Sequence, residues 1–510
     1  MPEHIRALIF ILFIATPVYL YAKKAVGPML MPEEFVRLRN AWIAITLFAF
    51  LSHNFWLFII LSSAYLLYIA KSEQNKFALY FALLIVIPPM TARIPSVFDV
   101  SYIRILSLTI LLPFFLTFRG SSENPSYAKP LAEKFMLVYM ILATILMMRG
   151  TTVTDALRFG FHGFLDIFLP YFAASRAIKD FEQLKKVMIS FILVCFIAAA
   201  IGTFEFSSGW LVYSTLPDAL HIDWDLGNYL GRGDSLRAFA SLGHSLVFGF
   251  VTMVALGFYI FIAPSIKNTT LRYAGFGLLF AGLISALSRG PWVGTAVLLL
   301  VVTAFGKNAI KRLTIIAVLV FFSLPILNFI PGGEKVIDLI PFVGQTDKEN
   351  VDYRGKLIDK SLLIIEKYPL FGVYDATKEP EMADMVTGEG IIDIVNTYLG
   401  VMLGNGLVGL GLLLGYYVLL ILTIFKGMRR IADRNSEEYL CGRTLFATLL
   451  AVLVTIFTMS GIGVVPAVYW SLAGLIFSYV RVTNPSRISK KSNAAIEKPV
   501  YPTTRLKSTA

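Results

Sequence analysis

"DIVNTYLGVMLGNGLVGLGLLLGYYVLLILTI", residues 393–424, is the stretch of sequence that decides the fold. After Asp393 it contains no charged side chain, and as a helix it is long enough to cross the roughly 30 Å hydrocarbon core of a bilayer. Small residues four apart, such as Gly400 and Gly404, allow a helix of this kind to pack closely against a neighbour. The stretch therefore predicts a membrane-spanning helix, although it opens on the polar side chains Asp393 and Asn396.

The composition extends this interpretation to the whole chain. Of 510 residues, 57% are hydrophobic and only 15% are charged, and the mean hydropathy is +0.71. Such values exclude an ordinary soluble domain. We expect an all-α, polytopic membrane bundle of about 14 transmembrane helices, within a range of 12 to 15. The predicted spans lie near 7–21, 41–70 (one long helix or a tight pair broken at His53-Asn54), 78–92, 101–117, 134–149, 161–175, 187–206, 238–262, 272–288, 291–306, 313–330, 394–424, 445–460 and 467–482.

Long polar connections divide the chain into parts. The tail from residue 481 has seven basic residues and one acidic residue, and an excess of Lys and Arg is typical of cytoplasmic segments. The net charge of +12 is thus mainly a topology signal rather than a sign of nucleic-acid binding. The predicted parts are an N-terminal transmembrane bundle (1–206), a first long outer loop (207–237), transmembrane helices (238–330), an extracytoplasmic cap loop (331–392), C-terminal transmembrane helices (393–482) and a disordered basic cytoplasmic tail (483–510).

The cap loop carries twelve acidic and seven basic residues, and a connection of this length is usually functional. Within it, Leu357, Ser361 and Ile364 have the spacing of an amphipathic helix, which Pro369 and Gly372 would end. We therefore expect a small helical cap on the outer face. The two cysteines, Cys195 and Cys441, are too few and too far apart in the sequence for a disulfide framework or a thiolate metal site.

Three arginines fall at the predicted outer boundary, in segments that are far apart in the sequence. They are Arg237, Arg289 and Arg354. A guanidinium group there is costly unless it pairs with an anion, and its planar fork suits phosphate or carboxylate. Each arginine alone could instead reach to lipid headgroups or pair with an acidic residue of a loop. Together they predict a site for an anion.

The polar opening of the 393–424 helix could serve the same site. On a helix that begins near 393, Asp393, Asn396 and Thr397 would share one face. The alternative is structural, because Asp393 could be a helix N-cap and Asn396 a hydrogen-bonding partner of the loop.

Three ordered features resemble the O-antigen ligase and O-antigen polymerase superfamily. Asn396, nine residues, Gly406, two residues and Gly409 are similar to one family signature. "LSRGPWVG" (287–294) resembles the family's Ser-Arg hinge, and "RGKLIDKSLLIIEKYPLFGV" (354–373) resembles its Arg followed by a Pro-Leu-Phe-Gly turn. The resemblance covers roughly 230–420 and implies a GT-C-like, metal-independent membrane glycosyltransferase without a cofactor.

The resemblance also implies a substrate and roles for residues. The donor would be an oligosaccharide on undecaprenyl diphosphate, whose diphosphate Arg237, Arg289 and Arg354 would bind. The family's histidine falls on Val395, which cannot accept a proton. The first candidate for the base is Asp393, the second is Glu389 and the third is His244. Asn396, three residues after Asp393, would belong to the same catalytic segment. Glycan could stack on Tyr398 or Tyr353, although most tyrosines of this region are expected to be packing residues.

Several alternatives remain open. The missing histidine favours a polymerase that joins repeat units of a surface polysaccharide or exopolysaccharide over a ligase that transfers glycan to a lipid acceptor. A flippase for the same lipid-linked sugar is a third hypothesis. Transporters tend to carry ionisable residues near the middle of the membrane, whereas this chain has mainly Asp166 there. "HIDWD" (221–225) imitates a metal-binding pair without further ligands. We expect a multi-pass protein of the bacterial inner membrane, with the active site facing the periplasm. The expected partners are membrane lipids and a possible chain-length regulator, and no nucleic acid.

Overall fold

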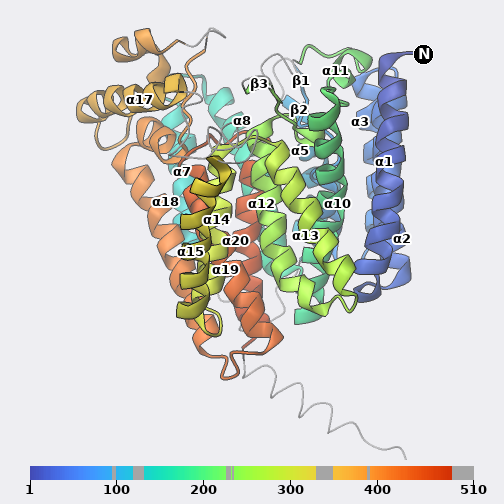
Figure 1. The fold of residues 1–510 in the computed structure, drawn as a ribbon. Coiled ribbons are helices and arrows are strands. Elements are labelled where there is room, and N and C mark those ends of the chain that lie inside the picture. Colours follow the sequence, from blue (N-terminus) through green and yellow to red (C-terminus); the bar gives the residue numbers. More distant parts are fainter. Residues whose placement is uncertain are drawn as a thin grey trace, which may run out of the picture.

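The computed structural model describes residues 1–94, 99–118, 131–224, 231–232, 235–328, 348–386 and 391–484. Helices dominate these residues and stand side by side in one bundle, with α17 projecting beyond one end (Figure 1). The helices are α1 (Glu3–Ala25), α2 (Pro32–Leu51), α3 (Phe55–Ser72), α4 (Lys76–Leu83), α5 (Tyr102–Leu106), α6 (Leu112–Thr117), α7 (Leu131–Met147), α8 (Val153–Gly163), α9 (Leu169–Arg176), α10 (Phe181–Ser208), α11 (Leu216–Ala219), α12 (Ser245–Ile262), α13 (Thr269–Ser285), α14 (Arg289–Ala304), α15 (Ala309–Asn328), α17 (Lys348–Lys367), α18 (Thr397–Arg429), α19 (Glu437–Ile456) and α20 (Val465–Val482).

The strands of the described residues form two small antiparallel hairpins. β1 (Thr91–Arg93) pairs with β2 (Asp99–Ser101), and β3 (Gly231–Arg232) pairs with β4 (Ser235–Leu236). Both hairpins lie at the same end of the bundle as α17 (Figure 1). We call this end the cap end.

Among the described residues, seven helices are long and apolar enough to cross a membrane, and two shorter apolar helices accompany them. The all-α membrane fold is therefore confirmed, while the expected number of about 14 spans stays a prediction. The seven are α1, α3, α10, α12 with its continuation to Ser265, α18, α19 and α20, and the two shorter ones cover Tyr102–Thr117 and Arg289–Ala304.

Two predicted spans look different in the structure. The stretch 41–70 is a pair of helices, because Asn54 ends the turn after α2 and caps α3 by accepting a hydrogen bond from the Leu57 N–H at 2.9 Å. The predicted span 78–92 is wrong as a continuous helix, since α4 ends at Leu83 and buried non-helical chain follows. Pro88 and Pro89 have no N–H to donate, so a helix could not continue through them.

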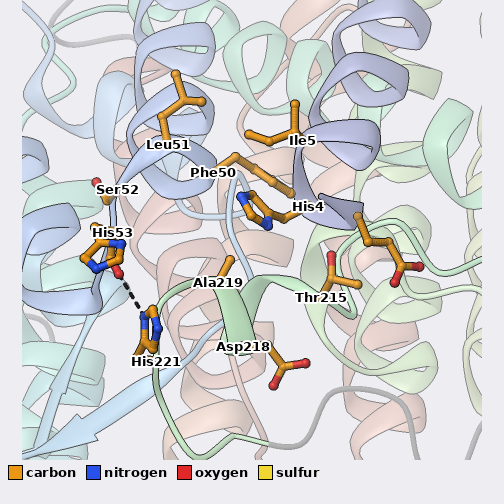
Figure 2. A pocket seen from close by; sticks show the side chains of 11 residues that line it. His4, Ile5, Phe50, Leu51, Ser52, His53, Thr215, Asp218, Ala219 and His221 are labelled. Atoms are coloured by element: carbon orange, nitrogen blue, oxygen red, sulfur yellow. Dashed lines mark hydrogen bonds between the residues drawn. The ribbon is translucent and has the colours of Figure 1, made fainter. Parts of the chain in front are cut away.

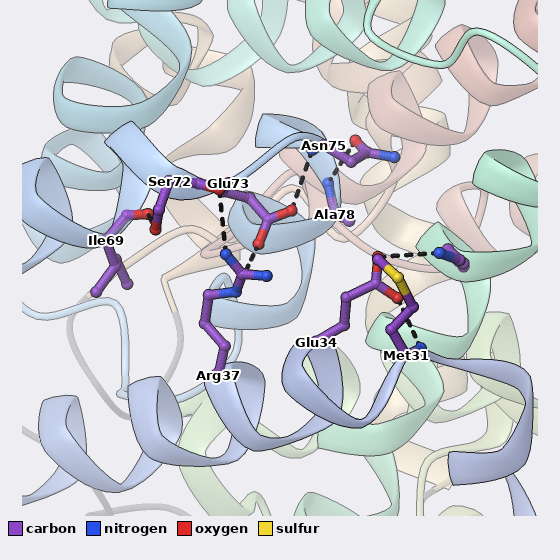
Figure 3. Close-up of polar contacts among 9 residues, drawn as sticks. Met31, Glu34, Arg37, Ile69, Ser72, Glu73, Asn75 and Ala78 are labelled. Atoms are coloured by element: carbon purple, nitrogen blue, oxygen red, sulfur yellow. Dashed lines mark hydrogen bonds and ion pairs between the residues drawn. The ribbon is translucent and has the colours of Figure 1, made fainter. Parts of the chain in front are cut away.

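Ion pairs tie the helices together at the end opposite the cap. Arg37 of α2 pairs with Glu73 at 3.1 Å and donates to the Ser72 carbonyl at 3.2 Å, which joins the start of α2 to the end of α3 (Figure 3). Glu34 pairs with Lys186 of α10 at 2.9 Å. The loop between α18 and α19 is also at this end (Figure 1), and it carries Arg430 and Arg434.

The most irregular feature of the bundle is a break in α18. Gly406 has φ 67 and ψ −169, which no helix allows. The turn at 368–373 fills the break: the N–H groups of Leu407 and Val408 donate to the carbonyls of Pro369 and Leu370 at 2.8 and 3.2 Å. In return the Val373 N–H donates to the Leu403 carbonyl at 2.8 Å. The turn therefore provides partners for backbone groups that the break would otherwise leave unsatisfied.

Arg149, which follows α7, also binds the junction between α18 and the 368–373 turn. Its guanidinium donates to the carbonyl oxygens of Gly372 at 2.6 Å and Gly404 at 2.9 Å. It also donates to the Leu146 carbonyl at the end of its own helix, at 2.9 Å. One side chain thus holds α7, the 368–373 turn and α18 together.

The cap has a small hydrophobic core of its own. The amphipathic helix expected at 354–367 is present as part of α17, with Leu357 and Ile364 buried. They pack with the first turns of α18, so the cap is fixed to the mouth of that helix. The core consists of Leu357, Ile364, Ala376, Met382, Met385, Leu399 and Leu403.

We predict that Gly406→Ala destabilises the protein. A Cβ at this position would lie 2.2 Å from the Leu370 carbonyl oxygen, and the left-handed backbone alone costs about 1–3 kcal/mol for a residue with a side chain. Thermal unfolding of the purified protein in detergent should show a lowered Tm. Gly404→Ala is the matched control, because Gly404 is helical and a Cβ there meets no atom within 4 Å. Equal melting temperatures for the two variants would contradict this account of the break.

Candidate functional site

The segment before α18 differs from the expected helix start. Asn396 is the N-cap, and its Oδ1 accepts hydrogen bonds from the N–H groups of Tyr398 and Leu399 at 3.0 and 3.1 Å. The helix therefore begins at Thr397, and residues 391–396 are not helical. The expectation that Asp393, Asn396 and Thr397 share a helix face is wrong, as is the N-cap alternative for Asp393. The amide oxygen of Asn396 is used in capping, which gives this residue a structural role.

Tyr353 of α17 holds the backbone of Asp393. Its hydroxyl donates to the Asp393 carbonyl at 3.1 Å and accepts from the Asp393 N–H at 3.0 Å. Burial raises the pKa of the Tyr353 phenol, so the group stays a neutral donor. Helix α17, which also carries Arg354, therefore contacts the segment that contains Asp393 through Tyr353.

Arg237 lies against the hinge between α13 and α14. Its Nη2 donates to Ser288 Oγ at 3.0 Å, and the next residue, Ala238, donates its N–H to the Ser285 carbonyl at 3.0 Å. Ser288 directly precedes Arg289, the first residue of α14. The segments that carry Arg237 and Arg289 are therefore in contact, although 51 positions separate Arg237 from Ser288.

The hinge and the start of α18 meet on the end of α19. Gly290 lies so close to this end that a Cβ there would be 2.2 Å from Thr458 Oγ1. Thr397 donates to the Met459 carbonyl from its N–H at 3.0 Å and from its hydroxyl at 2.8 Å. Hydrogen bonds and close contacts therefore connect Arg237, the Arg289 hinge and the Asp393 segment. Arg237, Arg289, Arg354 and Asp393 are all half-buried.

Glu205 of α10 is a residue that sequence reasoning missed. It is fully buried, and its Oε2 accepts from the N–H groups of Phe239 and Ala240 at 3.1 and 2.8 Å. Its Oε1 accepts from the Val212 N–H at 3.1 Å. Two of these hydrogen bonds hold the chain that follows Arg237, and the third holds the chain that follows α10. The sequence could have indicated this residue, because Glu205 lies within the predicted span 187–206 and burying a carboxyl group in a membrane span is costly unless it has polar partners.

Backbone strain occurs in the same two segments. Ala240 has φ 49 and Leu287 has φ 45, in the left-handed region that residues with a side chain rarely adopt. Such conformations persist where the surrounding structure over-determines them, and they cluster at functional sites. Here the Glu205 carboxylate holds Ala240, and Leu287 directly precedes the Ser288–Arg289 hinge.

His244 is poorly suited to act as the base. It caps α12, and its Nδ1 accepts from the Leu246 N–H at 3.1 Å. Burial, with the Arg237 guanidinium nearby, lowers the pKa of His244 to about 4. A neutral imidazole whose Nδ1 accepts a hydrogen bond carries its proton on Nε2. Neither nitrogen is then left to take a proton from a substrate, although Nε2 can donate a hydrogen bond.

The remaining predicted residues have mixed placements. Glu389 lies outside the described residues. Tyr398 donates its hydroxyl to the Leu453 carbonyl at 2.9 Å, an interhelical bond, so its predicted contact with glycan would use only the ring. In the part of the chain that the structure describes, no three His, Cys, Asp or Glu side chains are placed to hold a metal ion.

Asp166, the ionisable residue weighed in the flippase hypothesis, lies in the π-helical turn η4 (Phe164–Phe168) and forms an ion pair with Arg104. Its Oδ2 is 3.1 Å from Nη2 of Arg104, whose Nη1 donates to the Asp99 carbonyl at 2.6 Å. A second π-helical turn, η2 (Ser107–Leu111), contacts η4 through the Ser107 hydroxyl, which donates to the Leu165 carbonyl at 2.9 Å. Asp166 thus contributes to helix packing through an ion pair.

We predict that His244 makes folding sensitive to acid. The folded pKa of about 4 is below the ordinary 6.5, so the unfolded chain binds the extra proton between these values. The contribution of neutral His244 to stability is therefore complete above about pH 6.5 and is lost as pH falls towards 4. His244→Asn keeps an N-cap but does not titrate. Over this range, Tm should fall more for the wild type than for the variant, and parallel pH profiles would contradict the assignment.

A family model described as O-antigen ligase matches residues 274–414. The matched residues include the Arg289 hinge, α17 with Arg354, the 368–373 turn, the Asp393 segment and the break at Gly406. No curated protein matches the chain. The match supports a membrane enzyme of the polysaccharide ligase or polymerase type, and it identifies residues 274–414 as a domain of the O-antigen ligase kind, which supports membership in the O-antigen ligase and polymerase superfamily.

Proposed function

We propose that this protein polymerises undecaprenyl-diphosphate-linked oligosaccharide repeat units at the outer face of the bacterial inner membrane. Two observations support the proposal: Arg237 contacts Ser288, the residue before Arg289, and Tyr353, the residue before Arg354, binds the backbone of Asp393. In the proposed site the three arginines, each half-buried, would surround the mouth of α18. Half-buried guanidinium groups remain accessible to a ligand while their electrostatic attraction is less screened than in water.

The arrangement suits a glycosyl transfer with a diphosphate leaving group. An acceptor hydroxyl oxygen attacks the anomeric carbon of the donor sugar, and the bond from that carbon to the diphosphate oxygen breaks. The diphosphate departs with the bonding electrons, and the three guanidiniums neutralise its growing charge. A base takes the hydroxyl proton. Asp393 is the first candidate for it, because Tyr353 fixes its backbone by two hydrogen bonds, and Glu389 is the second.

The charge distribution supports the proposed orientation. The basic loop between α18 and α19 lies at the end of the bundle opposite the cap (Figure 1), and basic loops stay in the cytoplasm. The cap end would then face the periplasm, where flipped lipid-linked glycan is available. Membrane lipids surround the bundle in this proposal, and a chain-length regulator would act as a separate partner.

A ligase is the second candidate, because the matching family model is described as O-antigen ligase. The two reactions share the donor and the leaving group and differ in the acceptor, which is another repeat unit or a separate lipid. Purified protein in detergent, supplied with lipid-linked repeat units alone, distinguishes them. We expect products longer than one repeat. Transfer only after addition of a lipid acceptor would favour the ligase, and movement of the donor across liposomes without turnover would favour a flippase.

We predict that Arg289→Lys lowers turnover by about 100-fold or more, since one positive charge cannot replace a planar fork that binds two phosphate oxygens. Membrane insertion and Tm should stay close to the wild type. Arg93→Ala is the control, because it removes a cation that is also at the cap end but whose side chain is 79% exposed and pairs with Asp99. Normal polymer yield from Arg289→Ala would remove Arg289 from the mechanism.

We predict that Asp393→Asn abolishes glycosyl transfer and leaves the fold intact. Asn396 caps α18, so the substitution changes the charge and basicity at 393 without removing the cap. Loss of a positioned base costs about 100- to 10,000-fold in rate. Asp384→Asn is the matched control on the cap, because this carboxylate is mostly exposed and pairs with Lys360 at 2.9 Å. Turnover that survives Asp393→Asn would exclude Asp393 and leave Glu389 as the predicted base.

A further inference from the structure

A separate cavity opens at the cap end, between the start of α1, the end of α2 with the loop that follows it, and the short helix α11. Its volume is about 530 Å³, which is within the range of sites for small ligands. Figure 2 shows His4 in the middle of the lining group, with His53 and His221 on one side and Thr215 and Asp218 on the other. None of these residues belongs to the site around α18.

The floor of the cavity is rigidly built. His221 adopts left-handed backbone with φ 54, and its Nδ1 is 2.8 Å from the His53 carbonyl oxygen (Figure 2). Because a carbonyl only accepts, Nδ1 carries the proton of this bond. The Phe55 N–H donates to the Leu220 carbonyl at 2.9 Å and joins the same two segments. Strained backbone held by its neighbours is typical of sites that position a group.

Polar atoms of the lining are left for a ligand. Ser52 is 5% exposed, and its buried hydroxyl has no hydrogen-bond partner among the described residues. The buried hydroxyl of Thr215 is likewise without a partner there. Buried hydroxyl groups normally find partners, so these two indicate that something polar completes the site.

The lining selects the class of ligand. It contains the carboxylates of Glu3 and Asp218 and no Lys or Arg, which disfavours a phosphate or another anion. The carboxylates and imidazoles accept hydrogen bonds, whereas Ser52 and Thr215 can donate. Sugar hydroxyls, which both donate and accept, match this set. An aromatic cage for a quaternary ammonium is disfavoured, because Phe50 of the lining is only 1% exposed.

We propose that this cavity is a saccharide-binding subsite, distinct from the site of glycosyl transfer. The inference rests on the proposed function, because that function brings glycan to the cap end. The cavity would hold the sugar residues of an incoming or growing chain through their hydroxyl groups, at a distance from the diphosphate. It would contribute binding of glycan and no chemistry.

The test measures binding without turnover. The probe is the free oligosaccharide of one repeat unit, released from the surface polysaccharide of the host and titrated into purified full-length protein by calorimetry. The probe has no diphosphate, so it does not engage the arginines. We expect Asp218→Asn combined with His221→Asn to weaken binding by about tenfold or more. Asn tolerates left-handed backbone, so the fold should survive. Ala219→Trp, which fills the cavity, should have the same effect.

Asp223→Asn is the matched control, because it removes an equal charge from an exposed position of the same loop outside the lining and should bind like the wild type. Unchanged affinity in both cavity variants would overturn the proposal, as would binding of Zn²⁺ by the wild type without binding of the oligosaccharide. The same measurements distinguish failure of this inference from failure of the proposed function. Binding that depends on the cavity, without chain growth, would support the saccharide subsite and contradict the polymerase function. Chain growth without binding that depends on the cavity would support the polymerase function and contradict the subsite.

Discussion

The hydrogen bonds between the broken helix α18 and the turn at 368–373 are the interaction on which the rest of the site depends. A helix that opens near the membrane boundary exposes N–H and C=O groups that hydrocarbon cannot satisfy. Here Pro369, Leu370 and Val373 provide the partners, and Arg149 binds the two carbonyls that border the junction. The cap is therefore joined through the backbone to the helix that directly follows the Asp393 segment. Its hydrophobic core strengthens the same attachment.

This attachment explains how distant segments can form one site. Tyr353 reaches from the cap to the Asp393 backbone, while Met459 at the end of α19 accepts both hydrogen bonds of Thr397. On the other side, the Glu205 carboxylate fixes the chain after Arg237. Each of these contacts has a backbone group as one partner, so together they fix the course of the chain through the site. The strained backbone at Ala240 and Leu287 lies in the two segments that carry Arg237 and Arg289.

The sequence predicts the fold class well because long apolar segments have few alternatives in a membrane. It also predicts the amphipathic helix of the cap, while the grouping of the three arginines at the outer face stays a prediction. It misplaces the start of α18, because Asp393 and Asn396 are both good caps and only the tertiary contacts of Thr397 decide between them. The sequence does not reveal the break at Gly406, because glycines spaced along a helix are equally compatible with close helix packing and with a break in the helix. The run at 78–92 is apolar because it is buried, which hydropathy cannot distinguish from a helix.

Native mass spectrometry of the purified protein with undecaprenyl diphosphate tests the central claim most directly. The ligand has the proposed leaving group but no sugar, so binding reports on the guanidiniums alone. The wild type should retain undecaprenyl diphosphate in preference to the monophosphate, and a variant with Arg237, Arg289 and Arg354 all changed to Gln should lose that preference while keeping its fold. Equal retention of the two lipids by the wild type, or an unchanged preference in the triple variant, would contradict a diphosphate site at the mouth of α18.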